Sequence, residues 1–252
     1  QPSYGLVTPP EPFTQLETMA AHYIQEMRTQ QPSGPYYLGG YCFGGIIAYE
    51  MARQLHEKGE KIALLALLES VPLNAGPVIK SSPEFVRHFF GALPFWFIWI
   101  WSLGPAEMGR RIKLKLTSTK KRLGNLFGAT KAKYDLDQAL NARLGELVDM
   151  SQYPADFKRY AEMHWKAFAS YFPKKYPGRI TLFRTRQPRL FSFNPEVIWN
   201  RLALEGVQVE LVPGRHDQIL EEPHVQALAQ SLKNSLQKAH QTENTPKKSN
   251  DK

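Results

Sequence analysis

The stretch "YYLGGYCFGGIIAYEM", residues 36–51, decides the fold, because it changes from a strand pattern to a helix pattern within a few residues. The aromatic residues at its start favour a β-strand. From Gly44 onward the apolar residues recur with helical spacing, which predicts an α-helix. Cys42, the one cysteine of the chain, stands where the pattern changes, between two pairs of glycines. The chain therefore has a sharp strand-to-helix turn with a thiol on it.

The segments that follow extend this turn into an α/β fold with a mostly parallel sheet. The run "KIALLALLES", residues 61–70, is almost continuously apolar, as in strands that are covered on both faces. Strand, helix and strand in this order predict a parallel crossover unit. Strand patterns return at 178–185 and 207–214, and a last helix is expected over about 222–239. A first helix is expected to begin at Thr14, which has capping-box spacing to Glu17.

The middle of the chain, residues 75–171, loses this alternation and is predicted to be a helical insertion. The core is then formed by 1–74 and 172–240, and the polar segment 241–252 is expected to be a disordered tail. The aromatic run "FFGALPFWFIWIWSLG", residues 89–104, is shorter than the about 20 residues of a membrane span and contains a proline. No membrane span is therefore expected.

A basic segment, residues 108–134, contains no Asp or Glu and many Lys and Arg in a chain of net charge +9. An acidic partner should be attracted to it, although a solvated basic face is an equally simple interpretation. Nucleic acid is not expected, because the segment has no recognisable nucleic-acid motif and its aromatic residues precede the basic ones. A single cysteine excludes an internal disulfide and a multi-thiolate metal site, so a cytoplasmic location is expected.

The turn around Cys42 has the chemistry of a nucleophile elbow, with cysteine where serine is usual. Gly40 and Gly44 are predicted to let the strand and helix approach without side-chain clashes. The helix N-terminus favours a thiolate and a developing oxyanion, for which the amide of Phe43 is the expected donor. The alternative is a buried structural cysteine beside a turn.

A nucleophilic thiol requires a base and an acid that orients the base. His216 follows a strand on a loop at the carboxyl end of the predicted sheet, whereas most of the other histidines fall on helical segments. Glu69 ends the apolar strand after the elbow helix and is the expected acid. The alternatives are that Glu69 only caps its strand into solvent, or that Asp217 is the acid, although adjacency to His216 makes it badly placed.

Four stretches together resemble the thioesterase domains of nonribosomal peptide synthetases and polyketide synthases: "GPYYLGGYCFGGIIAYEMARQL", "ALLALLES", "YPGRITLFR" and "VPGRHDQILEEPHVQALAQSL". The resemblance implies an α/β-hydrolase fold with a helical lid inserted in the middle. It also implies action on acyl or peptidyl chains held as thioesters on the phosphopantetheine of a carrier protein, with no bound cofactor or metal. Cys42 falls on the nucleophile of the family, Glu69 on its usual aspartate and His216 on its histidine.

The chain departs from the family in three ways. Cys42 replaces serine, so the acyl-enzyme is a thioester, which we expect to favour capture by an amine or an internal nucleophile as well as by water. Glu69 replaces aspartate. Family members also begin earlier, with a strand and a glycine-containing loop that supplies the second oxyanion donor, so one or more N-terminal strands are expected to be missing from this sequence, which begins "QPSYGL".

These expectations lead to one main function and two alternatives. The main one is release of an acyl or peptidyl chain from a carrier protein through a Cys42 acyl-enzyme, by hydrolysis, aminolysis or cyclisation. The aromatic run would contact an apolar acyl chain, and the basic segment would meet an acidic carrier protein. The alternatives are a stand-alone editing thioesterase and a non-catalytic module that binds carrier proteins.

Overall fold

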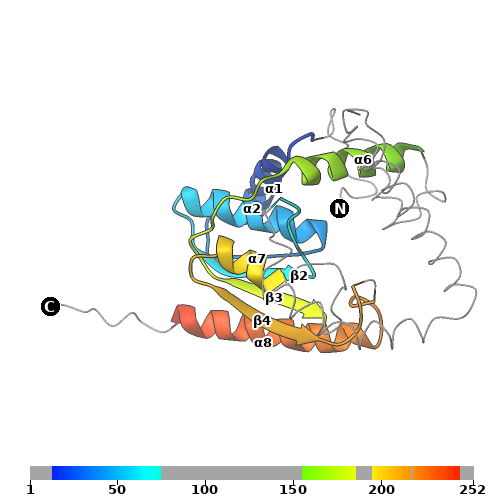
Figure 1. Cartoon of the computed structure of the whole chain (residues 1–252). Helices are drawn as coiled ribbons and strands as arrows, with labels where there is room; N and C mark the ends of the chain where they lie inside the picture. Colours follow the sequence, from blue (N-terminus) through cyan, green and yellow to red (C-terminus); the bar gives the residue numbers. More distant parts are fainter. Residues whose placement is uncertain (1–12, 75–154, 186–194, 217, 245–252) are drawn as a thin grey trace, which may run out of the picture.

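The computed structural model describes residues 13–74, 155–185, 195–216 and 218–244 of the chain (Figure 1). Four parallel strands form one sheet in the order β1-β2-β3-β4. The strands are β1 (Tyr36–Tyr41), β2 (Ile62–Leu68), β3 (Ile180–Thr185) and β4 (Val207–Val212). The helices are α1 (Leu16–Gln30), α2 (Phe43–Glu57), α6 (Ala155–Ser170), α7 (Pro195–Leu202) and α8 (His224–Asn244). The predicted α/β architecture with a parallel sheet is confirmed.

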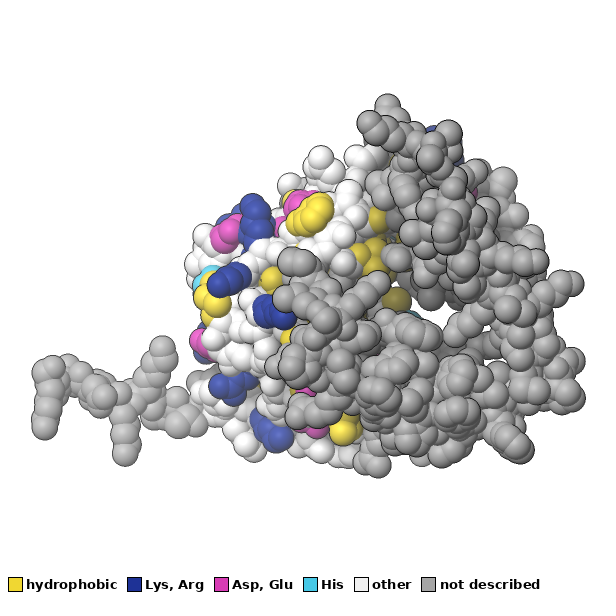
Figure 2. All heavy atoms as spheres, viewed as in Figure 1, with side chains coloured by type: hydrophobic (Ala, Val, Ile, Leu, Met, Phe, Trp, Pro, Cys, Tyr) yellow, Lys and Arg dark blue, Asp and Glu magenta, His cyan; other side chains and the backbone are white. Residues whose placement is uncertain are grey.

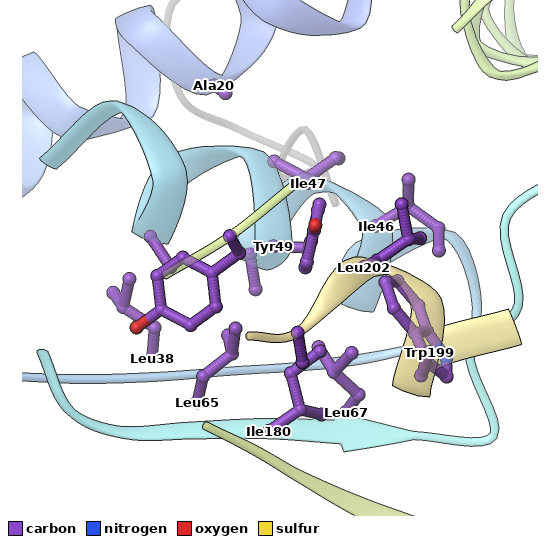
Figure 3. Packing of buried hydrophobic residues seen from close by; sticks show 14 of the residues in the cluster. Ala20, Leu38, Ile46, Ile47, Tyr49, Leu65, Leu67, Ile180, Trp199 and Leu202 are labelled. Carbon is purple, nitrogen blue, oxygen red and sulfur yellow. The ribbon is translucent and has the colours of Figure 1, made fainter. Parts of the chain in front are cut away.

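Helices cover both faces of the sheet, with α1, α2 and α7 on one side and α8 on the other (Figure 1). Strand β2 is apolar throughout because it contributes side chains to the cores on both faces of the sheet. Leu65 and Leu67 belong to the core beneath α2 and α7, whereas Leu64 and Ala66 belong to the core against α8. Figure 3 shows Leu65 and Leu67 pointing toward the side chains of the first core. Because successive residues of a strand face opposite sides, both sets need apolar side chains.

Two predictions made at the ends of helices are wrong. Helix α1 begins at Leu16 with Gln15 as its N-cap, and no side chain caps it, so the capping box at Thr14 is not formed. Leu16 is fully buried and packs in the core. Burial of this first residue, instead of a side-chain cap, therefore stabilises the start of the helix. Helix α8 continues to Asn244, into the segment 241–252 that was predicted to be disordered.

Helix α6 confirms helical structure at the end of the predicted insertion. The aromatic run 89–104 and the basic segment 108–134 lie outside the described residues, so their predicted roles stay predictions. In the described part of the face shown in Figure 2, basic, acidic and hydrophobic side chains are interspersed. Within the ranges that the structure describes, no helix is both long and apolar enough to cross a membrane.

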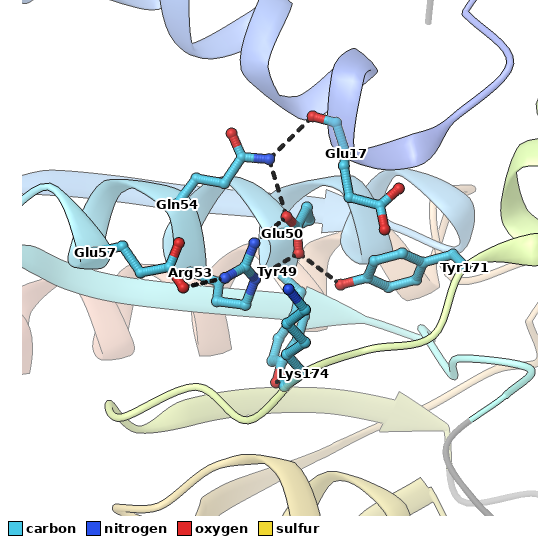
Figure 4. A network of polar contacts seen from close by, with 8 residues as sticks. All are labelled: Glu17, Tyr49, Glu50, Arg53, Gln54, Glu57, Tyr171 and Lys174. Carbon is cyan, nitrogen blue, oxygen red and sulfur yellow. Dashed lines mark hydrogen bonds and ion pairs between the residues drawn. The ribbon is translucent and has the colours of Figure 1, made fainter.

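A buried polar network joins the elbow helix α2 to the segment that follows α6 (Figure 4). The carboxylate of Glu50, which is 1% exposed, accepts hydrogen bonds from Arg53 Nε at 2.8 Å and Arg53 Nη2 at 2.6 Å. Gln54 Nε2 donates to it at 2.9 Å and Tyr171 Oη at 2.8 Å. Tyr49 Oη donates to the carbonyl oxygen of Lys174 at 2.6 Å. These bonds fix the chain after α6 against the helix that begins at the elbow.

Replacing Glu50 by glutamine is expected to lower the free energy of unfolding at pH 7 by about 3 kcal/mol, because the Arg53 guanidinium loses its buried counter-charge and keeps only the exposed Glu57. Burial of Glu50 acts to raise its pKa, but the hydrogen bonds from Arg53, Gln54 and Tyr171 outweigh burial and lower it. A lowered carboxyl pKa gives stability that is present above the unfolded-state pKa of about 4 and is lost as the pH falls through the folded-state pKa.

The difference between wild type and Glu50→Gln should therefore shrink as the pH falls below about 4. Urea unfolding at pH 7 and at successive acidic pH values measures this difference directly. Glu57→Gln is the matched control, because Glu57 also pairs with Arg53 but its side chain is 62% exposed. An equal loss in both variants, or a difference that does not depend on pH, would contradict the role given to Glu50.

Candidate active site

Cys42 is the single residue between β1 and α2, and its backbone has an unusual conformation. Its φ is 53° and its ψ is −117°, in a left-handed region of the backbone that residues other than glycine rarely adopt. The Cys42 amide donates to the carbonyl of Leu68 at 2.9 Å, and its own carbonyl accepts from the amide of Gly45 at 3.2 Å. The side chain is exposed. A conformation of this kind costs about 1–3 kcal/mol and persists at functional sites, where it serves to present a side chain.

The glycines around Cys42 do not all have the predicted role. A Cβ atom at Gly40 would lie 2.3 Å from the carbonyl carbon of Gly44, so glycine is required there by backbone contact, as predicted. For Gly44 the prediction is wrong, because a Cβ atom there would have no described heavy atom within 4 Å. The next residue, Gly45, takes this role: its Cβ would lie 1.9 Å from Ser70 Oγ and 2.8 Å from the carbonyl oxygen of Gly40.

Gly45→Ala is therefore expected to lower the free energy of unfolding by about 1–3 kcal/mol, the usual cost of overpacking. Gly44→Ala is the matched control one residue earlier in the same helix. It should leave stability unchanged or raise it by up to about 1 kcal/mol, since alanine favours helix over glycine. Urea unfolding of both variants measures the change in the free energy of unfolding. Equal losses in the two variants would show that Gly45 is no more important than Gly44 for the approach of α2 to β1.

Glu69 follows the last residue of β2 and is held by the neighbouring strand. Its amide donates to the carbonyl of Phe183 at 2.8 Å, and its carboxylate oxygen Oε1 accepts from the amide of Thr185 at 2.5 Å. The side chain is 11% exposed. Like Cys42, Glu69 has a positive φ, of 50°. One carboxylate oxygen is thus fixed by the backbone of β3, and the other is directed to a partner.

That partner is His216, on the loop after β4. Glu69 Oε2 lies 3.3 Å from His216 Nδ1. The imidazole also stacks on the ring of Tyr41, with the ring centroids 5.0 Å apart and the planes inclined by 29°. The Cys42 amide donates to the carbonyl of Leu68, which precedes Glu69, so Cys42 and Glu69 follow neighbouring strands. The contact between Glu69 and His216 brings the loop after β4 to the same end of the sheet. The structure brings Glu69 and His216 into contact and presents Cys42 beside Tyr41.

Phe43 begins α2, so its amide belongs to the first turn, where backbone N–H groups have no partner within the helix. Such a group is suited to donate to a negatively charged oxygen formed next to Cys42. The Phe43 ring packs against α6, with centroids 5.8 Å from His164 and 5.5 Å from Phe168. Burial lowers the pKa of His164, which keeps this imidazole uncharged near neutral pH. The residue predicted to offer the oxyanion donor is thus held by aromatic rings of α6.

The other described histidines make contacts that suit structural roles. His22 lies against Phe13, His56 against Tyr176, and His240 against Tyr37. A Cβ atom at Gly214 would lie 2.8 Å from the His224 ring, which shows how closely that ring packs on its loop. Asp217, the alternative acid, lies outside the described residues. In the described part of the chain, no group of three or more His, Cys, Asp or Glu side chains is arranged to hold a metal ion.

Sequence reasoning predicted Cys42, Glu69 and His216 as site residues but missed three residues that make contacts around them. Thr185 fixes the Glu69 carboxylate, Gly45 allows the helix to approach, and Tyr41 contacts His216. For Tyr41 the sequence offered a signal, because this residue directly precedes Cys42. The contacts of Thr185 and Gly45 depend on how segments distant in the sequence pack against one another, which one sequence does not show.

Comparisons with known proteins point to the same family that the sequence resembles. Residues 1–75 match the family model of the thioesterase domain. The chain is 30% identical over 227 residues to the non-reducing polyketide synthase terA of Aspergillus terreus, covering 89% of this chain and 10% of that protein. It is 45% identical over 69 residues to a dimodular nonribosomal peptide synthase of Bacillus subtilis, covering 27% of this chain and 3% of that protein. The chain therefore spans a small part of these relatives.

A solved structure is similar over almost the whole chain. The NocB thioesterase domain, in a covalent complex with a fluorophosphonate nocardicin G analogue, superposes with a TM-score of 0.57 at 26% identity. The match covers 94% of this chain and 80% of that one. The expected α/β-hydrolase fold is therefore confirmed.

Proposed function

We propose that this chain releases acyl or peptidyl chains from a carrier protein through a covalent intermediate on Cys42. The chain is a thioesterase-type α/β-hydrolase related to the thioesterase domains of nonribosomal peptide and polyketide synthases. The observation that carries the proposal is the exposed Cys42 side chain on a left-handed turn between β1 and α2. Glu69 and His216, in contact with each other, supply the acid and base that such a thiol needs.

In the first step, His216 takes the proton of the Cys42 thiol. The nitrogen suited to this is Nε2, because Nδ1 lies toward Glu69. The thiolate attacks the carbonyl carbon of the thioester, and the oxyanion that forms accepts a hydrogen bond from the Phe43 amide. The bond to the pantetheine sulfur breaks, and that sulfur takes the proton back from His216. The products are acyl-Cys42 and the carrier with its thiol.

In the second step, His216 takes a proton from an incoming water, amine or hydroxyl group while this group attacks acyl-Cys42. The bond to the Cys42 sulfur breaks, and the proton returns to the sulfur. Exchange of one thioester for another is nearly isoenergetic, so the acyl group keeps its reactivity on Cys42. An amine attacks a thioester more readily than an oxyester, which supports aminolysis and cyclisation beside hydrolysis as outcomes for this chain.

The carrier protein is the proposed partner, and phosphopantetheine is the proposed bearer of the substrate. The relatedness to carrier-dependent synthases supports both. An acidic carrier is proposed to dock on the basic segment 108–134. That segment lies outside the described residues, and its support is its sequence charge.

The experiment that tests this function is turnover of an acyl N-acetylcysteamine thioester, with and without a simple primary amine. Mass spectrometry of the products separates the carboxylic acid from the amide. We expect thioester consumption by the wild type and a growing share of amide as the amine concentration rises. Acid alone at every amine concentration would exclude aminolysis and leave hydrolysis. The absence of both products with folded protein would favour the alternative of a non-catalytic carrier-binding module.

A further inference from the structure

Tyr41 makes two separate contacts with His216, although the two residues are distant in sequence. Tyr41 is the last residue of β1 and is bonded directly to Cys42. Its ring stacks on the imidazole of His216, with centroids 5.0 Å apart. Its hydroxyl donates a hydrogen bond to the backbone carbonyl of His216. One side chain therefore contacts both the ring and the main chain of the proposed base.

These contacts supply a restraint that Glu69 alone does not. The contact between Glu69 Oε2 and His216 Nδ1 is long, at 3.3 Å, and it holds the imidazole at one atom. A ring held at one atom still pivots about that contact. Stacking on Tyr41 fixes the plane of the ring, and the bond to the carbonyl fixes the loop that carries it. Proton transfer depends steeply on such placement, because an error of about 1 Å costs on the order of 100-fold in rate.

We propose that Tyr41 is a positioning residue that holds the His216 imidazole relative to the Cys42 sulfur and thereby sets how readily the thiol ionises. The proposal rests on the proposed function, because it takes Cys42 and His216 as nucleophile and base. Tyr41 is suited to this task by its place in the chain. Tyr41 ends β1 and is bonded to Cys42, so covalent geometry sets the spacing between the nucleophile and the residue that supports the base.

The same strand provides a matched control. Tyr37, near the other end of β1, also pairs with a histidine: its hydroxyl lies 2.9 Å from His240 Nδ1, and the ring centroids are 4.7 Å apart. His240 belongs to α8 and has no place in the proposed site. Replacing Tyr37 therefore removes a similar aromatic–histidine pair from the same strand without touching His216.

The test is the pH dependence of Cys42 alkylation by iodoacetamide, which reports the thiolate. With one cysteine in the chain, the signal has a single source. We expect Tyr41→Leu to move the inflection of the curve of alkylation rate against pH upward by about 1 pH unit, toward the value near 8.5 of an isolated thiol. The alkylation rate at pH 7 should then fall by about 10-fold. The plateau at high pH, which reports access to the sulfur, should not change.

Two further variants separate the two contacts and guard against a folding defect. Tyr41→Phe keeps the stacking and loses the hydroxyl, so it should move the inflection less than Tyr41→Leu. Tyr41→Trp keeps an aromatic ring at this position, so its curve of alkylation rate against pH should stay close to that of the wild type. Tyr37→Leu should leave the inflection unchanged.

His216→Ala distinguishes a failure of this proposal from a failure of the proposed function. If His216→Ala raises the inflection and none of the Tyr41 variants does, Tyr41 does not position the base, and the assignment of Cys42 and His216 stands. If His216→Ala leaves the inflection at its wild-type value, the pairing of base and thiol fails, and the role of Tyr41 fails with it. An equal shift in Tyr37→Leu and Tyr41→Leu would show a general loosening of β1 and would also overturn the proposal.

Discussion

Cys42→Ala is expected to lower thioester turnover by on the order of 10⁴-fold or more, the usual cost of removing a covalent nucleophile. The loss should be one of chemistry and not of folding. The Cys42 side chain is exposed, so its removal leaves no cavity, and alanine keeps the Cβ atom at the same left-handed φ of 53°. The measurement is the rate of acid and amide formation from an acyl N-acetylcysteamine thioester, together with the free energy of unfolding.

Cys42→Ser is the matched variant for this prediction, because it keeps a nucleophilic group at the elbow and changes sulfur to oxygen. Its acyl-enzyme is an oxyester, which reacts with amines more slowly than a thioester does. We expect Cys42→Ser to retain some hydrolysis while its share of amide product falls. Turnover in Cys42→Ala within a few-fold of the wild type would show that the sulfur is not the nucleophile.

His216→Ala is expected to produce the second-largest effect, a loss in turnover on the order of 10³-fold, because the base that takes the thiol proton is removed. Glu69→Gln should cost a similar factor, on the order of 10³-fold or more. A glutamine oxygen that accepts from the Thr185 amide turns its NH2 group toward His216 Nδ1, which favours the imidazole tautomer that is protonated at Nε2 and cannot take the thiol proton. Steady-state turnover of the same thioester measures both variants.

The double variant His216→Ala/Glu69→Gln makes this prediction sharper. Because Glu69 is proposed to act through His216, its replacement should cost almost nothing once His216 is absent, so the effects of the two changes should not add. Independent losses that multiply in the double variant would mean that Glu69 acts on the reaction by a separate route. His56→Ala is a suitable control, since His56 packs against Tyr176 away from the site.

Much of the fold was predictable from the sequence because its signals are local. The apolar run of β2 predicted a strand covered on two faces, and Leu65 and Leu64 indeed lie in different cores. The change of pattern at Cys42 placed the turn correctly to within one residue, since β1 ends at Tyr41 and α2 begins at Phe43. Both features depend on the periodicity of side chains along one segment, which a single sequence displays.

The site was predictable only in part, because it depends on contacts between segments. Glu69 and His216 were chosen for their places at strand ends, and the 3.3 Å contact between them agrees with that choice, while their catalytic roles stay predictions. The pattern of glycines predicted a steric role for Gly44. That role belongs to Gly45, where an added Cβ atom would meet Ser70, two residues after the end of β2.

The proposed acyl-enzyme on Cys42 is the step on which the proposed function depends. It is tested most directly by mixing the protein with an excess of an acyl N-acetylcysteamine thioester, quenching with acid at short times and measuring the intact mass, followed by peptide mapping. We expect a mass increase equal to the acyl group, located on the peptide that contains Cys42 and absent from Cys42→Ala. A folded wild-type protein that shows no adduct, or one that carries the acyl group on another peptide, would contradict it.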